Sequence, residues 1–181
     1  MSHLTIYADT DSESPLIDTD DFDVISEELG NAGIQIERWT ADRELADDAD
    51  NDTIIAAYQN EIDQLVAIGG YQTWDVVSMR ADHPEKDAFR SKFLDEHTHS
   101  EDEVRFFVRG HGLFIIHAND RVYSMLCEKD DLISVPANTR HWFDMGPNPN
   151  FTAIRLFNNP EGWVANFTGD DIAIRFPFLD N

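Results

Sequence analysis

Two histidines and a glutamate lie close together near the middle of the chain, at His97, His99 and Glu103. Side chains two residues apart point to the same face of an extended strand, so the two imidazoles can face a common point. Imidazole nitrogens and carboxylate oxygens are common ligands of Fe, Ni, Mn, Co and Zn ions. The spacing therefore predicts a metal site.

This metal site requires a bent backbone and at least one distant ligand. Six residues of straight strand span roughly 20 Å, whereas metal–ligand bonds are about 2 Å long. We therefore expect a bend over residues 100–102, between His99 and Glu103. His141, which follows the turn-forming residues 136–140, is the best candidate for a fourth ligand. The alternative is an exposed histidine-rich edge with His141 in the core.

The composition limits the class of protein. With 181 residues, 41% hydrophobic and 11% aromatic, the chain is long and apolar enough for one folded domain over residues 1–181. A net charge of −23 disfavours direct binding to nucleic acids or anionic membranes. Cys127 is the only cysteine, so an internal disulfide is excluded and we expect a buried thiol. The N-terminal residues lack signal-peptide features, which favours a cytoplasmic protein.

The first half of the chain shows both helical and strand patterns. Apolar spacing and turn residues predict three strands, at Leu4–Tyr7, Ile34–Trp39 and Thr73–Met79. Three helices are expected at Asp20–Leu29, from Asp52 or Thr53 to Val66, and at Pro84–Leu94 with the proline in its first turn.

The residue pattern of the second half predicts short strands separated by turns. The predicted strands are Val104–Val108, Leu113–His117, Val122–Cys127, Leu132–Val135 and Phe151–Phe157. A turn at 110–112 is expected between the first two. Such a series is typical of an antiparallel sandwich or barrel. We therefore predict a mainly β protein with added helices (α+β), in which a helix-containing portion at 1–95 packs onto a barrel at 96–181 that holds the metal.

The motif around His97 resembles the first motif of the cupin superfamily, whose members are small jelly-roll barrels with a metal in the barrel mouth. Residues 136–141 resemble the second cupin motif, with Asn138 where glycine is usual. Asn tolerates the left-handed conformation better than most residues, so this change is mild. Asp130 and Met145 also depart from the generic motif.

A closer resemblance is to the acireductone dioxygenase family in its bacterial form. The similar segments are 93–99, 103–108, 126–129, 131–137, 141–146 and 159–163, together with 37–39 and 71–76 nearer the N-terminus. They cover nearly the whole chain. The resemblance implies a methionine-salvage enzyme that cleaves 1,2-dihydroxy-3-keto-5-methylthiopentene with O₂.

The resemblance also implies a cofactor and its ligands. One Fe(II) or Ni(II) ion per chain is expected, held by His97, His99, Glu103 and His141. In the family the Fe(II) form yields 4-methylthio-2-oxobutanoate and formate. The Ni(II) form yields 3-methylthiopropionate, formate and carbon monoxide. The ligand set by itself does not select the ion, because nitrogen and oxygen donors suit several metals.

Three charged residues match family positions with catalytic roles. Arg105 matches the residue that favours the substrate dianion, which a guanidinium stabilises electrostatically. Glu96 and Asp102 match positions involved in metal incorporation and in relaying local conformational change. The alternatives are a surface charge on a strand for Arg105 and solvated acids for the two carboxylates.

Other residues have weaker assignments. Phe93, Phe143 and Trp163 are candidates for the wall of the substrate pocket, or for the core. Arg155 either adds positive charge inside the barrel or pairs with an acid. His111 and His117 are expected to mark a turn and a strand end, and not to be ligands.

Two further functions stay open from the residues alone. One is a cupin isomerase or oxidase acting on a sugar or small acid, and the other is a non-catalytic metal- or ligand-binding cupin. The dioxygenase requires two open metal positions and consumes O₂, an isomerase would not consume O₂, and a binding module would do neither. For its partners we expect a small-molecule substrate, O₂ and a monomeric chain, with no nucleic acid or membrane.

Overall fold

A computed structural model describes residues 1–159 and 164–180. Strands predominate, as the mainly β prediction requires. The strands are β1 (His3–Ala8), β2 (Ile17–Thr19), β3 (Gln35–Arg38), β4 (Thr73–Arg80), β5 (His97–Thr98), β6 (Glu103–Ala118), β7 (Arg121–Glu128), β8 (Asp131–Val135), β9 (Arg140–Asp144), β10 (Asn150–Phe157) and β11 (Asn166–Phe167). The helices are α1 (Phe22–Asn31), α2 (Asn51–Ala57), α3 (Gln59–Gly69), α4 (Lys86–Phe93) and the short 3₁₀ helix η1 (Ile172–Arg175).

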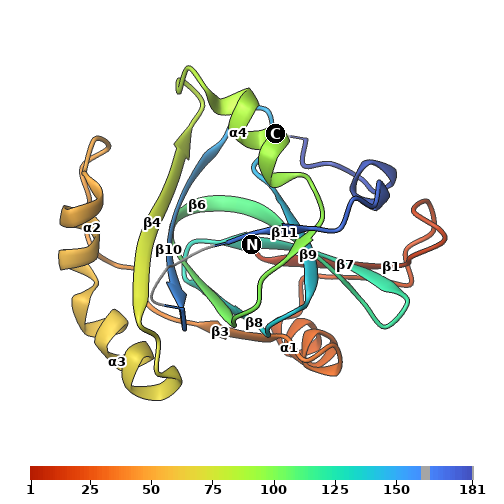
Figure 1. The fold of residues 1–181 in the computed structure, drawn as a ribbon, viewed down its shortest axis with the longest axis horizontal. Coiled ribbons are helices and arrows are strands. Elements are labelled where there is room, and N and C mark those ends of the chain that lie inside the picture. Colours follow the sequence, from red (N-terminus) through yellow and green to blue (C-terminus); the bar gives the residue numbers. More distant parts are fainter. Residues whose placement is uncertain (160–163, 181) are drawn as a thin grey trace.

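The strands form one antiparallel sheet that curls around a common interior (Figure 1). Its hydrogen-bonded path runs β11-β5-β9-β6-β7-β1-β2, while β10 and β8 also pair with β6. β4 pairs with β10, and β3 pairs with β8. The arrangement confirms the predicted jelly-roll class. It also places the first candidate ligand, His97, on β5 and the third, Glu103, at the start of β6, and both strands border the interior.

The central strand β6 corrects one prediction. The expected strands Val104–Val108 and Leu113–His117 are a single strand, and residues 110–112 form no turn. The strand kinks at Gly110, where φ is +63° and a Cβ atom would lie 1.7 Å from the carbonyl oxygen of Asn150. Glycine was therefore a correct indication of a backbone irregularity, but the neighbouring strands keep the segment extended.

The kink region also exchanges the two faces of β6. The register against β10 shifts between Thr152 and Ala153, so that one residue of β6 is unpaired. Before the shift, Phe107 packs in the interior and Phe106 packs outside; after it, Phe114 is interior and Ile115 exterior. An extra residue in one strand reverses which side chains face the core.

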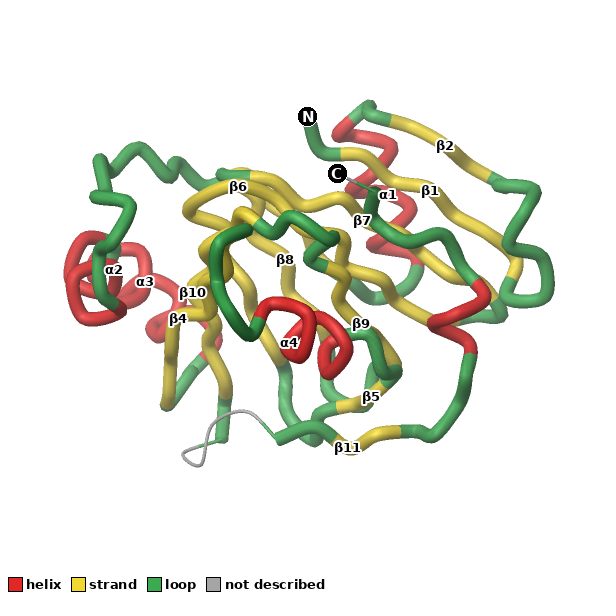
Figure 2. Tube along the Cα trace, turned by 90° about the horizontal axis from the view of Figure 1, so that it is seen from above, coloured by secondary structure: helices red, strands yellow, loops and turns green. Residues whose placement is uncertain are grey.

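The N-terminal portion supplies strands to the barrel and does not only pack onto it. β1 pairs along its whole length with β7, and β4 pairs with β10. Helices α2 and α3 cover the outside of β4 (Figure 2), where their apolar side chains form a cluster with β4, β6 and β10. This layer fixes the β6–β10 wall of the barrel.

Several element boundaries differ from the predictions. The second predicted helix is interrupted at Tyr58, which ends α2 and begins α3. Pro84 lies before α4 and not in its first turn, because that helix starts at Lys86. β2, β9 and β11 were not predicted.

Helix α4 is held against the barrel by an ion pair. Arg90 donates from Nε and Nη2 to the two carboxylate oxygens of Asp144 on β9, at 2.7 and 2.9 Å. The segment that follows α4 leads directly into β5 and so to His97 and His99. Within residues 1–159 and 164–180, no helix is both long and apolar enough to cross a bilayer.

Candidate metal centre

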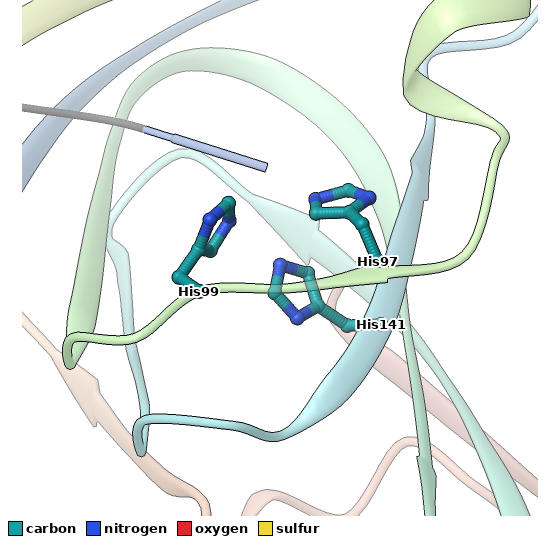
Figure 3. Close-up of side chains that lie close together, drawn as sticks. All are labelled: His97, His99 and His141. Atoms are coloured by element: carbon teal, nitrogen blue, oxygen red, sulfur yellow. The ribbon is translucent and has the colours of Figure 1, made fainter. Parts of the chain in front are cut away.

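Three histidines converge inside the barrel (Figure 3). His97 lies on β5 opposite His141 on β9 in the strand register, and His99 follows β5 by one residue. One ring nitrogen from each lies within 4.8 Å of those of the other two. All three side chains are at most 5% exposed.

Backbone carbonyls orient all three imidazoles. Nδ1 of His97 lies 2.7 Å from the carbonyl oxygen of Asp95, and Nδ1 of His141 lies 2.8 Å from that of Thr139. Nδ1 of His99 lies 2.7 Å from the carbonyl oxygen of Val164. Because a carbonyl can only accept, each neutral ring must carry its proton on Nδ1, which leaves the Nε2 lone pair available to a metal.

Glu103 reaches the same region from the start of β6. Its Oε2 atom lies 3.1 Å from Nε2 of His99 and 3.6 Å from Nε2 of His141. It does not belong to the group of ligand atoms that all lie within 4.8 Å of one another. The chain bends at residues 100 and 101, as predicted, and this bend brings the carboxylate back to the histidines.

The electrostatics of the centre favour a bound cation. Burial lowers the pKa of His97 to about 3, so its imidazole is neutral near neutral pH. Burial raises the pKa of Glu103, but the Arg105 guanidinium together with His141 and His99 outweighs this, and the pKa is held well below its usual value. One carboxylate oxygen thus lies 3.1 and 3.6 Å from two imidazole nitrogens, and a divalent ion would be attracted by all three atoms. Nitrogen and oxygen donors of this kind fit a first-row transition metal.

Arg105 is not a surface charge. It is 2% exposed, and its Nε donates to Oε1 of Glu103 at 2.6 Å. Its guanidinium carbon lies 4.8 Å from the ring centroid of Phe114 and 5.0 Å from that of Phe143. The two rings and the carboxylate hold a positive charge beside the histidines.

Two contacts join the bend to the turn that precedes His141. The backbone N–H of Ala137 donates to Oδ1 of Asp102 at 2.8 Å, and that of Asn138 donates to the carbonyl oxygen of His99 at 2.7 Å. Asn138 has φ of +62°, so it adopts the left-handed conformation expected at this position. Asp130, the other departure from a motif glycine, has φ of +82°. Asp102 is exposed, but it is not simply a solvated acid, because its carboxylate accepts a hydrogen bond from the turn that precedes His141.

Glu96 is buried, so it is not the solvated acid that was the alternative for this residue. It is 1% exposed, its Oε2 accepts from Nδ1 of His117 at 2.8 Å, and its Oε1 accepts from Oγ1 of Thr168 at 2.8 Å. Burial raises the pKa of Glu96, but these two hydrogen bonds more than offset it and the net shift is downward. His117 lies near the end of β6, as expected, and is outside the three-histidine group.

The remaining predicted residues are placed as follows. Phe93 and Phe143 are buried in the interior cluster with their ring centroids 6.4 Å apart, so packing accounts for both. Arg155 lies opposite Arg105 in the strand register and forms two hydrogen bonds with Asp75, at 2.8 and 2.6 Å. Trp163 lies outside the described residues. His111, expected in a turn, lies within β6.

Sequence reasoning missed the residues that support the ligands. The Val164 carbonyl and the Thr168 hydroxyl come from a segment more than 60 residues beyond β5, and no pattern marks them. His117 could have been noticed only as one of seven histidines in the chain. Backbone carbonyls carry no sequence signature, because every residue has one.

Comparison with known proteins decides the family. A model of the ARD/ARD' family matches residues 3–165 of this chain. The chain belongs to the ARD/ARD' family. The match covers all four candidate ligands, although the geometry alone would have fitted several kinds of metal cupin.

Individual relatives of the ARD/ARD' family are similar over nearly their full length. The chain is 62% identical over 179 residues to the acireductone dioxygenase of Cronobacter sakazakii, covering 99% of both chains. It is 59% identical over 180 residues to that of Serratia proteamaculans, covering 99% of this chain and all of the relative. A solved acireductone dioxygenase from Bacillus anthracis with a cadmium ion in its active centre superposes with a TM-score of 0.78 at 32% identity. It covers 92% of this chain and 98% of that one.

Proposed function

We propose that this chain is an acireductone dioxygenase of methionine salvage, which cleaves 1,2-dihydroxy-3-keto-5-methylthiopentene with O₂. Membership of the ARD/ARD' family and about 60% identity to proteins of that name support the activity. The observation that carries the proposal is the set of three converging imidazoles whose Nδ1 atoms are held by carbonyls, with Nε2 of His99 and of His141 facing a buried carboxylate. This arrangement suits a metal enzyme better than a structural core.

The cofactor proposed is one Fe(II) or Ni(II) ion per chain. His97, His99, His141 and Glu103 would hold it, since they are the buried donors that converge. When bound, the ion supplies Lewis acidity that favours an ionised substrate. The cadmium ion reported in the active centre of the Bacillus anthracis relative supports a metal at the equivalent place.

The chain's own charged residues would bind and orient the substrate anion. Arg105 offers a fixed, desolvated guanidinium beside the ligands, and we propose that it stabilises the substrate dianion. Arg155 lies in the adjacent strand position, but its pairing with Asp75 reduces the charge it can offer. Asp102 positions the His141 turn through Ala137. Phe93, Phe143 and Trp163 stay candidates for the pocket wall.

The domain organisation, oligomeric state, location and partners of the protein are also part of the proposal. We propose that residues 1–181 act as one domain, supported by the pairing of β1 and β4 with strands of the second half. We further propose a cytoplasmic monomer whose partners are the small-molecule substrate and O₂. The charge of −23 argues against nucleic acids and anionic membranes as partners.

The test is to load the metal-free protein separately with Fe(II) and Ni(II) and to supply the acireductone under O₂. We expect O₂ uptake and formate from both forms. The Fe(II) form should give 4-methylthio-2-oxobutanoate, and the Ni(II) form should give 3-methylthiopropionate with carbon monoxide in the headspace. Metal-free protein is the control.

Each other outcome favours a different function. Conversion of substrate without O₂ uptake would indicate a cupin isomerase, and metal binding without any turnover would indicate a binding module. Identical products from the two metal forms would show that the pocket, and not the ion, sets which bonds break.

A further inference from the structure

The segment that carries two of the candidate ligands has little backbone support. β5 contains only two residues, and a single residue pair, His97 with His141, joins it to β9. Its other neighbour is β11, which is equally short and pairs through Asn166 and Phe167. Longer strands of the barrel pair over five to eight positions. Some other contact must therefore hold His97 in place.

A cluster of three polar side chains lies immediately behind this segment, and we name it the Glu96 anchor. Its members are Glu96, His117 and Thr168. The imidazole of His117 donates from Nδ1 to one carboxylate oxygen, and the Thr168 hydroxyl donates to the other, both at 2.8 Å. The backbone N–H of Thr168 also donates to the carbonyl oxygen of Glu96 at 3.0 Å.

The anchor lies on the opposite face of the sheet from the metal ligands. Alternation along β6 places His117 with the exterior residue Ile115, while Ile116, the register partner of His141, is interior. Glu96 precedes His97 and reaches across β9 to His117, which is 21 positions away in the sequence. One carboxylate thus connects the ligand segment to the long, well-paired strand β6.

The anchor also holds β11 against the ligand segment. Thr168 directly follows β11, whose Phe167 packs on His97 with ring centroids 5.8 Å apart. Val164, two residues before β11, accepts the hydrogen bond that orients His99. Loss of the anchor would therefore loosen the orientation of two imidazoles together.

From this geometry we propose that His117 is a positioning residue of the metal centre, which acts by donating from Nδ1 to Glu96 and so fixes β5 and β11. The inference rests on the proposed metal-dependent function. His117 is not a ligand in this proposal and touches no substrate. Its second nitrogen, Nε2, lies 3.5 Å from the partly exposed Asp9 and has no role in it.

The test measures the affinity of metal-free protein for Co(II) through the visible absorption of the bound ion. His117→Leu should raise the dissociation constant about tenfold, the usual scale for loss of a partner behind a metal ligand. His117→Asn should restore affinity to within about threefold of wild type, because its amide nitrogen replaces Nδ1 as donor. His117→Gln, whose amide corresponds to Nε2, should stay weak.

Two further variants keep the test independent of folding. Thr168→Val removes the other donor to Glu96 and should weaken Co(II) binding in the same direction, even if His117→Leu does not fold. Asp9→Asn alters only the Nε2 side and should bind like wild type. Because asparagine keeps a donor to Glu96, His117→Asn combined with Thr168→Val should bind about as well as Thr168→Val alone.

The proposal is overturned if the leucine and asparagine variants both bind Co(II) like wild type, or if both are equally weak. A general loss of stability would appear as lowered thermal unfolding temperatures in all His117 variants, with no rescue by asparagine. Failure of the proposed function looks different, since wild-type protein itself would then bind no Co(II). Substitution of His97 by Ala provides the reference for a lost ligand.

Discussion

Two clusters of charged and polar side chains, each built around a buried carboxylate, differ in how their polar atoms are satisfied. The histidine cluster consists of His97, His99, Glu103 and His141. The Asp131 cluster consists of Ser2, Arg38, Glu128 and Asp131. Both lie on or next to strands of the same sheet, and Asp131 and Glu103 are each at most 1% exposed.

In the Asp131 cluster the buried carboxylate of Asp131 accepts hydrogen bonds from other groups of the protein. The Ser2 hydroxyl and the backbone N–H of Glu128 donate to Oδ2 of Asp131 at 2.6 and 2.8 Å, and Nε of Arg38 lies 3.2 Å from Oδ1. In the histidine cluster, neither Oε2 of Glu103 nor Nε2 of His141 has a hydrogen-bond partner among the described residues. Buried polar atoms in native proteins are normally paired. Oδ1 of Asp131 also makes no hydrogen bond within the described part of the chain, but it faces the Arg38 guanidinium. Oε2 of Glu103 instead faces two histidine nitrogens, where a bound cation would satisfy it.

Replacing a histidine ligand should give the largest effect. His97→Ala should weaken Co(II) binding more than about 100-fold, beyond the loss expected for a residue behind a ligand. The metal-free variant should lose less stability than a variant of Asp131, because it removes one of three ring nitrogens that lie within 4.8 Å of one another without a cation between them. Equilibrium dialysis and thermal unfolding measure the two quantities, with His3→Ala, a partly exposed histidine on β1, as control. Full metal occupancy in the variant would remove His97 from the ligand set.

Replacing Asp131 should show the opposite pattern. Asp131→Ala leaves the donors of Ser2 and Glu128 without their acceptor and should lower the free energy of unfolding by about 2 kcal/mol. Its Co(II) affinity should equal that of wild type. Urea unfolding of the metal-free protein gives the first value. A variant that kept wild-type stability but lost metal would contradict the division between the two clusters.

One residue in the left-handed conformation lies near each cluster. Replacing these two residues should have smaller effects that again distinguish the two clusters. Asn138 precedes His141 and Asp130 precedes Asp131, both with positive φ. Alanine at either position should cost about 1 kcal/mol of stability from the backbone conformation alone. Only Asn138→Ala should also weaken Co(II) binding, by a few fold, while Asn138→Gly should behave like wild type. Equal metal affinities in the two alanine variants would show that the turn does not position His141.

The smallest expected effect is a pH dependence of the Asp131 cluster. Burial raises the pKa of Asp131, and its hydrogen bonds offset this only in part. The folded state then binds the proton more tightly than the unfolded chain, so this contribution to stability is lost as pH rises through the raised pKa. Asp131→Asn does not titrate, and its stability relative to wild type should improve from about pH 4.5 to about pH 7. Parallel unfolding curves at both pH values would contradict the shift.

Local patterns predicted those parts of the site in which neighbours along the chain act together. The spacing of His97 and His99, the bend before Glu103 and the left-handed Asn138 all follow from strand alternation and from the conformations that short polar residues tolerate. The same reasoning misread Gly110 as part of a turn. A glycine marks an irregularity in the backbone, but the pairing of β6 with four other strands decides whether the chain reverses there.

The sequence by itself determined the residue types that can bind a metal, the mainly β architecture and the family. Only the tertiary structure decided which atoms face one another: the Val164 carbonyl on His99, His117 on Glu96, and Ser2 on Asp131. These pairs join positions 21 to 129 residues apart. Their contacts depend on strand register and on the face exchange in β6, which are set by the packing of the whole sheet and leave no periodic trace in any one segment.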